Sequence, residues 1–166
     1  AKADAKAAAA TDCPTIKDVY GAKYKESPDD LTAVKTLYKK LKRGGCKSDP
    51  LFMEVLLKWQ TLEPSASRAR YIAQTYQKQK NYAQAQSYYE KSLDLETDNT
   101  KKAGTYMQLA KLEQVANNNL SKARANARKA AELRAGWGNP YMFIGDLYMR
   151  SKSSCSSDGY GGSSVY

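Results

Sequence analysis

The stretch YIAQTYQKQKNYAQAQSYYEKSLDLE, from Tyr71 to Glu96, decides the fold. It contains no histidine, cysteine, glycine or proline, so nothing in it is typical of an active site. Three small residues, Ala73, Ala85 and Ser92, stand among large ones. Small residues at fixed places in paired helices indicate close crossings, because one helix must leave room for the ridges of the other.

The same arrangement recurs along the chain. Five positions recur at an offset of 38 residues. Tyr82, Ala85, Tyr89, Ser92 and Leu95 are followed 38 residues later by Leu120, Ala123, Ala127, Ala130 and Leu133, in that order. Phe52, Leu56, Trp59 and Leu62 precede Ala85, Tyr89, Ser92 and Leu95 by 33. Between these segments, Ile72-Ala73 matches Leu109-Ala110 at an offset of 37, and Leu109-Ala110 matches Ile144-Gly145 at 35. Self-similarity at a period in the thirties indicates a helical repeat.

Apolar residues recur three and four apart within each unit, and no segment alternates with period two. Glycine, proline and polar clusters break the pattern near residues 44–45, 63–67, 97–100, 117–119 and 136–140. The sequence predicts helices at 16–22, 29–43, 50–62, 66–79, 83–95, 101–116, 121–134 and 140–151. Ala73, Ala110 and Gly145 are the expected contact points on first helices, and Ala85 and Ala123 are their counterparts on second helices.

These residues resemble the tetratricopeptide repeat, whose unit of about 34 residues has small and aromatic residues at fixed positions. Ala73, Tyr76, Ala85, Tyr89 and Ser92 stand at its characteristic separations. Thr97 replaces the motif's proline, which Pro64 supplies one unit earlier, and Glu113 stands where the motif has a large apolar residue. The resemblance spans about residues 28–150. It implies an all-α, right-handed superhelix of antiparallel helix pairs, with about three repeats and a concave groove lined by first helices.

A second resemblance concerns the segments around these repeats. It involves five places: Cys13, the run from Tyr24 to Leu31, LEPSA at 62–66, WGNPYMFIGDLY at 137–148 and Cys155. At these places the chain resembles secreted tetratricopeptide proteins of Bacteroidetes-type bacteria. This resemblance implies a periplasmic or outer-membrane-associated protein in a larger envelope complex. We expect an N-terminal extension and first helix at 1–27, the repeat domain at 28–151, and a flexible Ser/Gly-rich segment at 152–166 after which the chain continues.

Three cysteines, at 13, 46 and 155, offer one structural link. Cys13 and Cys46 each sit next to a helix break, where a disulfide would join the first helix to the first hairpin. An exported protein would form this bond, whereas a cytosolic one would keep both thiols free, and both alternatives stay open. Cys155 is then either free or paired beyond Tyr166.

The composition argues against catalysis. The chain of 166 residues has no histidine, the commonest general base and metal ligand, and no C-x-x-C pair. A nucleophilic cysteine would lack its base, and the scattered carboxylates are best interpreted as a solvated face. We therefore expect no enzyme, cofactor or metal site, and an enzyme would need chemistry from a further part of the chain. No apolar run reaches the ~20 residues of a membrane-spanning helix.

A net charge of +10 permits nucleic acid or another acidic partner. One basic group comprises Lys39, Lys40, Lys42, Arg43 and Lys47, and a second comprises Lys122, Arg124, Arg128, Lys129 and Arg134. Nucleic-acid binding requires such groups to merge into one face with exposed aromatic rings. The tyrosines are better explained as packing, so nucleic acid is the alternative rather than the first hypothesis.

The repeat template predicts which side chains line the groove. The set is Arg70, Gln74, Gln77, Met107, Lys111, Met142, Asp146 and Met149, with Lys78, Gln114 and Asn139 beside them. Arg70 and Lys111 offer charge, but the complete carboxylate clamp of some tetratricopeptide domains is missing. We expect a non-catalytic scaffold that presents this groove to a protein partner. The competing interpretation is that a neighbouring segment of the same chain fills the groove.

Overall fold

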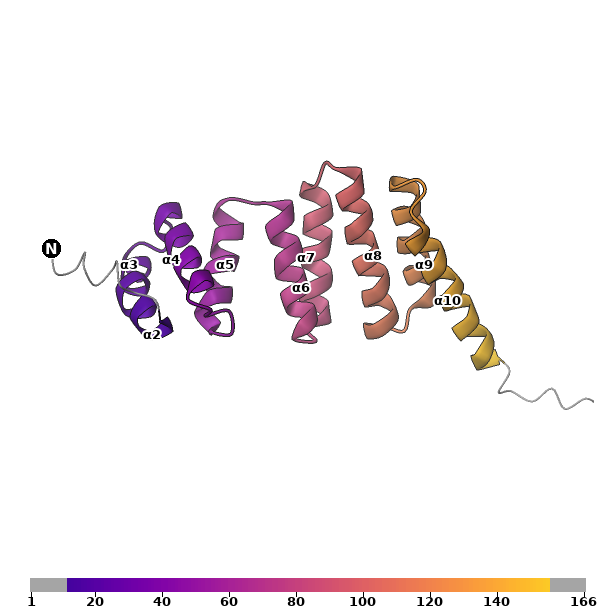
Figure 1. The fold of residues 1–166 in the computed structure, drawn as a ribbon, viewed down its shortest axis with the longest axis horizontal. Coiled ribbons are helices and arrows are strands. Elements are labelled where there is room, and N and C mark those ends of the chain that lie inside the picture. The colour runs from indigo at the N-terminus through magenta and orange to yellow at the C-terminus, as the bar shows by residue number, and fades with distance from the viewer. Residues whose placement is uncertain (1–11, 156–166) are drawn as a thin grey trace, which may run out of the picture.

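The computed structural model describes residues 12–155, which form helices and connecting loops without any strand (Figure 1). Most of the predicted N-terminal extension, up to residue 11, and residues 156–166 of the predicted flexible segment lie outside the described residues. The pairing state of Cys155 lies outside them as well. The predicted all-α class is confirmed, and antiparallel helix pairs follow one another along an elongated molecule.

The first helical segment is longer than the predicted range of 16–22. It comprises α2 (Cys13–Ile16), a π-helical stretch η1 (Lys17–Gly21) and α3 (Ala22–Glu26), which follow one another without a break. Asp12 starts the segment by accepting a hydrogen bond from the backbone N–H of Thr15. The Asp12 cap accounts for the earlier start, and burial of Tyr24 against the first helix pair accounts for the extension past residue 22.

The remaining helices follow in the predicted order. They are α4 (Leu31–Arg43), α5 (Pro50–Leu62), α6 (Ala66–Lys78), α7 (Tyr82–Leu95), α8 (Asn99–Ala116), α9 (Leu120–Leu133) and α10 (Gly138–Cys155). Their ends lie within two residues of the predicted ones, with one exception. Helix α10 continues to Cys155, four residues past the predicted end at 151, and the boundary of the flexible segment at 152 stays a prediction.

Two helix pairs share one tight turn. Lys80, between α6 and α7, and Asn118, between α8 and α9, have left-handed φ angles of 59° and 47°. They lie 38 residues apart, which is the repeat offset found in the sequence. The next residue caps the second helix in both cases, since Asn81 and Asn119 accept a hydrogen bond from the backbone N–H three residues later. The repeat is therefore a repeat of turn chemistry as well as of packing.

The small residues lie at helix crossings, as predicted. Ala73, Ala85, Ala110 and Ala123 have no exposed surface, and α6–α7 and α8–α9 pack along their lengths. Ser92 is also fully buried and donates its hydroxyl to the carbonyl of Ala66, 2.9 Å away, so a polar residue closes the end of the α6–α7 crossing. These contacts fix each pair at short distance.

Gly145 departs from this pattern. It is exposed, and a Cβ added there would meet no heavy atom within 4 Å. The prediction that Gly145 is a crossing point was wrong for the described part of the chain. The physical reason is that α7 and α9 cover the matching faces of α6 and α8, whereas no described helix covers this face of α10.

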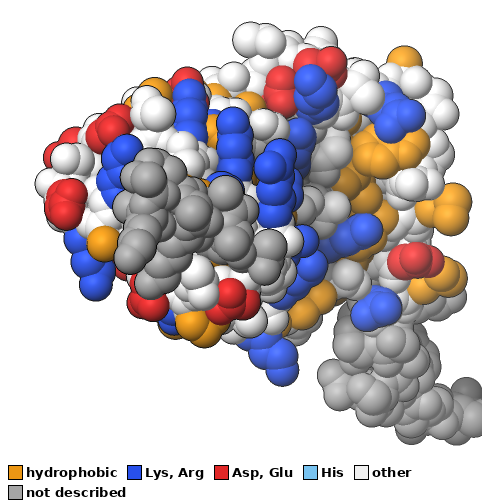
Figure 2. Space-filling view, turned by 60° about the vertical axis from the view of Figure 1, so that its left-hand side comes forward, with side chains coloured by type: hydrophobic (Ala, Val, Ile, Leu, Met, Phe, Trp, Pro, Cys, Tyr) orange, Lys and Arg blue, Asp and Glu red, His pale blue; other side chains and the backbone are white. Residues whose placement is uncertain are grey.

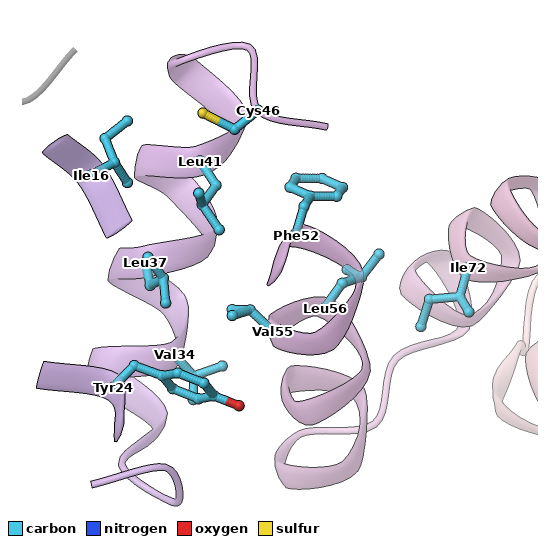
Figure 3. Packing of buried hydrophobic residues seen from close by; sticks show 10 residues of the cluster. All are labelled: Ile16, Tyr24, Val34, Leu37, Leu41, Cys46, Phe52, Val55, Leu56 and Ile72. Atoms are coloured by element: carbon cyan, nitrogen blue, oxygen red, sulfur yellow. The ribbon is translucent and has the colours of Figure 1, made fainter. Parts of the chain in front are cut away.

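The hydrophobic core is divided along the molecule. Figure 3 shows the first cluster, in which Val34, Leu37 and Leu41 of α4 face Phe52, Val55 and Leu56 of α5. A second cluster centres on Ala85, Tyr89 and Leu112, and a third on Met107, Ala110 and Ala127. Each cluster lies between neighbouring helices, which is the local packing expected of a repeat protein.

A disulfide joins Cys13 to Cys46, with their Cα atoms 5.7 Å apart. It connects the start of α2 to the loop that follows α4. An ion pair of 2.8 Å between Lys17 and Asp49 links the same two segments, and the lysine holds the pKa of Asp49 below its usual value, helped by the backbone N–H of Leu51. The N-terminal helix is thus tied to the first pair covalently and by charge. Among residues 12–155, no helix combines the length and hydrophobicity of a membrane span.

Ala85→Leu and Ala123→Leu should each lower the free energy of unfolding by about 1–3 kcal/mol, because three added carbons would overpack a closed crossing. Urea unfolding followed by circular dichroism measures this. Ala83→Leu and Ala125→Leu serve as matched controls, since both alanines are exposed on the same helices two residues away. Equal losses in the control and crossing variants would contradict the packing described here.

Replacing Cys13 and Cys46 together by alanine should lower the free energy of unfolding by roughly 3–4 kcal/mol, because the bond closes a loop across a sequence separation of 33 residues. The comparison is between the double variant and the oxidised parent in urea. Reduction of the parent should bring its unfolding midpoint close to that of the variant. If neither the double substitution nor the reduction shifts the unfolding midpoint, the bond does not constrain the unfolded chain.

Candidate binding surface of the first helices

The helices α4, α6, α8 and α10 are the first helices of successive units. Two pockets open between them, one between α8 and α10 and one between α4 and α6. Their linings occupy equivalent positions: Ser67 and Tyr71 of α6 line one pocket, and Gly104 and Gln108 of α8, each 37 residues later, line the other. The repeat therefore places both pockets on the same side of the helix array.

The α8–α10 pocket has a volume of about 380 Å³. Its lining combines apolar side chains with a few polar ones: Gly104, Met107, Gln108, Lys111, Trp137, Asn139, Met142, Phe143 and Asp146. Met107 is almost fully buried and forms part of the floor, whereas Met142 is 69% exposed and stands at the opening. A deep apolar floor with polar groups at the rim is the usual composition of a binding pocket.

Four of the eight predicted groove residues meet in this pocket. Met107 and Lys111 come from α8, and Met142 and Asp146 come from α10. Lys111 and Asp146 are exposed, so a cation and a carboxylate stand on the two helices that border the apolar floor. The repeat template brought these four side chains together from positions up to 39 residues apart in the sequence (146 − 107).

Arg70 lies elsewhere and has internal partners. Its guanidinium lies 3.4 Å from both the carbonyl of Lys101 and the hydroxyl of Thr105, and 4.0 Å from the carboxylate of Glu96. Its side chain is only 22% exposed. Arg70 therefore ties α6 to α8 and to the loop before it, and the structure does not place it beside Lys111.

The other three predicted residues also lie outside the α8–α10 pocket. Burial raises the pKa of Tyr89 to about 12, and its hydroxyl donates a hydrogen bond to the side-chain oxygen of Gln77 at 2.7 Å. Gln77 is thus part of the α6–α7 packing. Gln74 is exposed on α6, and Met149 is 66% exposed on α10, beyond the pocket.

Four lining residues were not predicted from the sequence: Gly104, Gln108, Trp137 and Phe143. Gly104 and Gln108 belong to the helical stripe 104–107–108–111, so the spacing of three and four around Met107 contained the signal. Trp137 stands in the segment that was interpreted only as a helix break. The guanidinium of Arg134 lies 4.9 Å from its ring centroid, which holds the indole against the end of α9.

The α4–α6 pocket has a volume of about 310 Å³ and a different character. It is lined by Tyr38, Lys42, Leu56, Trp59, Ser67, Arg68 and Tyr71. The Arg68 guanidinium lies 3.9 Å from the centroid of the Trp59 ring, and the ring of Tyr38 meets the same indole edge-on at 5.0 Å. Aromatic rings and cations, without a carboxylate, therefore form its lining.

Glu63 is the carboxylate nearest to this cluster. It accepts hydrogen bonds from the ammonium of Lys35 at 2.9 Å and from the indole N–H of Trp59 at 2.8 Å, and it pairs with Arg68 at 3.5 Å. The hydrogen bond from Lys35, then that from Trp59, hold the pKa of Glu63 below its usual value. One anion thus faces two cations, so the cluster keeps a net positive charge. Burial raises the pKa of the Tyr38 hydroxyl beside it.

The two basic groups of the sequence lie on helices that are far apart along the molecule. Helix α4 lies near one end of the molecule and α9 near the other (Figure 1). Several cations of α9 contact rings of neighbouring helices: Arg124 lies 5.0 Å from the ring of Tyr148, and Lys129 lies 5.4 Å from that of Tyr106. Figure 2 shows a band of Lys and Arg side chains across the molecule, with hydrophobic side chains gathered beyond it.

The described residues offer little for a metal or for acid–base chemistry. Within residues 12–155, no group of three or more Cys, Asp or Glu side chains is arranged to hold a metal ion. Among the same residues, no buried side-chain nitrogen or oxygen lacks a hydrogen-bond partner. This surface therefore consists of an apolar floor in one pocket and of rings and cations in the other.

No family model and no curated protein matches the sequence. Two solved structures are similar in fold, "Crystal structure of MamA" and "Crystal structure of MamA protein". The first has a TM-score of 0.62 and 21% identity, over 83% of this chain and 77% of that one. The second has a TM-score of 0.61 and 21% identity, over 83% of this chain and 72% of that one.

At this level of identity the likeness concerns the fold alone. MamA is an all-α helical-repeat structure of the tetratricopeptide type, and the helix order and pairing described above agree with it. The resemblance to secreted proteins of Bacteroidetes-type bacteria stays a prediction. The chain has a tetratricopeptide-like, all-α helical-repeat fold.

Proposed function

We propose that this protein is a non-catalytic scaffold that binds a protein partner on the side formed by its first helices. The observation that carries the proposal is the α8–α10 pocket, in which Met107, Lys111, Met142 and Asp146 come together around an apolar floor. A helical repeat holds such a surface rigidly, and partners commonly bind there through a few anchor side chains.

The pocket suits a large apolar side chain of the partner. Its floor is supplied by Met107, Trp137 and Phe143, and the exposed Met142 can adjust its three side-chain torsions to the shape of what enters. Lys111 and Asp146 at the rim would then hydrogen-bond to the partner's backbone or to its polar groups. Arg70, Gln74 and Gln77 have a smaller part in this proposal than in the sequence-based prediction, because they lie outside the pocket.

We also propose that the protein works outside the cytoplasm, in a periplasmic or outer-membrane-associated assembly. The Cys13–Cys46 disulfide supports this, because such bonds persist in oxidising compartments. Mass spectrometry of the protein from its native source, alkylated without prior reduction, tests the proposal. A linked peptide pair is expected, and alkylation of both thiols would remove this support.

Gly104→Phe should abolish partner binding without loss of stability. Gly104 lines the pocket, and a Cβ there meets nothing within 4 Å, so the ring can enter the pocket from α8 without a clash of its first atom. Phenylalanine also has a higher helix propensity than glycine. Immobilised parent and variant proteins are compared by the set of proteins each retains from native membranes, and by their melting temperatures.

Gly145→Phe is the matched control. Gly145 is also a helical glycine with free space around it, but it lies on α10 outside the pocket lining. The partner should be lost with Gly104→Phe and kept with Gly145→Phe. The reverse result would move the binding site to the exposed face of α10. Retention by both variants would contradict a site on either surface, and a salt-titrated assay with DNA and RNA would then test the alternative of nucleic-acid binding.

A further inference from the structure

The first helices change in character along the array, and this change indicates what kind of partner they accept. The α8–α10 pocket is mainly apolar, whereas the α4–α6 pocket contains two cations, Lys42 and Arg68, and no carboxylate. Because the two linings share equivalent positions on α6 and α8, one extended segment can run along this side and contact both pockets. The chemistry of the α4–α6 pocket then decides which ligand groups this part of the segment carries.

Lysines on α4 supply unpaired positive charge next to the α4–α6 pocket. Lys35, Lys39 and Lys42 follow one another at spacings of four and three, so they share one face of the helix. Lys35 is engaged by Glu63, but Lys39 and Lys42 are exposed and form no ion pair with a carboxylate of residues 12–155. Arg43, at the end of the same helix, is exposed as well.

The internal carboxylate does not neutralise this surface. Glu63 already accepts from Lys35 and Trp59 and pairs with Arg68, so its oxygens are committed to the cluster below the lysines. Arg68 is held in place by the Trp59 ring and by a hydrogen bond to the carbonyl of Glu63. Arg68 is thus engaged inside the protein, with its side chain only 12% exposed. The exposed lysines beside it have no such partner among the described residues and can pair with a carboxylate from outside.

A polypeptide carboxylate fits this pocket better than a nucleic-acid phosphate does. Single-stranded nucleic acids bind through bases stacked on open aromatic faces. In this pocket Arg68 covers a face of Trp59, and Tyr38 packs against both Trp59 and Phe52, with the Phe52 centroid at 5.2 Å. The rings of Trp59 and Tyr38 therefore contact other side chains of the protein, and Arg68 is paired with Glu63. Lys42 is the exposed cation of this lining.

We propose that the partner is an acidic protein segment that carries a large apolar side chain. Its apolar side chain enters the α8–α10 pocket, and its carboxylates lie against Lys39 and Lys42 of α4, at the α4–α6 pocket. This proposal rests on the proposed function, because it uses the α8–α10 pocket as the apolar anchor. It adds a second site, between α4 and α6, and the chemistry of the ligand.

The probe is an end-blocked peptide with a central tryptophan between two arms of six glutamates, each of which reaches about 20 Å when extended. The central position makes the probe independent of the direction in which the segment runs. A matched peptide has glutamine in place of every glutamate. Binding is measured by fluorescence anisotropy at 50 and 300 mM salt. At 50 mM salt we expect the glutamate peptide to bind at least about tenfold more tightly than the glutamine peptide. The difference should shrink at 300 mM, since exposed charges are screened as salt rises.

Two double variants with the same change in net charge localise the effect. Lys39→Glu/Lys42→Glu should weaken the glutamate peptide about tenfold, whereas Lys91→Glu/Lys122→Glu, on exposed positions of the second helices α7 and α9, should change it less than twofold. The milder Lys39→Gln/Lys42→Gln variant should give an intermediate loss, and thermal melting confirms that each variant is folded. Equal weakening by the two charge-reversal pairs would mean that only net charge matters and would overturn the α4–α6 site.

Gly104→Phe separates this inference from the proposed function. If the variant weakens both peptides while the lysine variants change neither, the apolar pocket stands and the acidic partner is wrong. If the variant has no effect on either peptide, the pocket itself is not the anchor and the proposed function fails. Failure of the glutamate peptide to bind overturns the inference, as does tighter binding of a single-stranded DNA of equal charge, which would identify a nucleic-acid surface.

Discussion

The close crossing of two helices through small residues is the constraint on which this structure depends. Ala73 and Ala110 on first helices and Ala85 and Ala123 on second helices have no exposed surface, so the backbones of each pair approach without large side chains between them. Such crossings have few alternative packings, because a displaced ridge would meet a methyl group rather than a groove. The crossing therefore fixes which face of each first helix turns away from its partner helix.

That outward face carries the binding chemistry, and its position follows from the crossing. On α8, Ala110 is buried against α9, while Gly104 and Lys111 line the pocket toward α10. The polarity of this face can then vary from one unit to the next, because its side chains are not part of the packed crossing that stabilises the pair. This separation explains how α4 carries lysines and α10 carries methionines within one repeat architecture.

The fold was more predictable from the sequence than the candidate site, because the repeat pattern describes helix packing but not the individual contacts of surface side chains. Positions of alanines and aromatics recur at offsets of 33 to 38, so the helices, their order and their crossings could be read from the sequence. The groove was predicted by placing residues on the repeat template, and the structure places Met107 and Met142 of adjacent first helices in one pocket lining, while their part in binding stays a prediction. It did not foresee the partners of Arg70, because the carboxylate of Glu96 lies in the loop before α8 and the carbonyl of Lys101 lies in the first turn of α8. Gly145 shows the converse error: the spacing marks a crossing, but a crossing also needs a second helix.

The junction between the first helix pair and α6 is built differently from the crossings within pairs, and this difference bears on the binding surface. It uses Trp59, Arg68 and Glu63, joined by ring stacking, hydrogen bonds and an ion pair, in place of buried alanines. Such a polar junction is directional, because each donor must meet its acceptor, and it leaves space between α4 and α6 that side chains only partly fill. The polar contacts stand beside apolar packing, because Ile72 of α6 is fully buried in the same core cluster as Phe52 and Leu56 of α5. A carboxylate entering the α4–α6 pocket would extend a hydrogen-bonded network that already exists, which costs less reorganisation than building a charged site between helices in close contact.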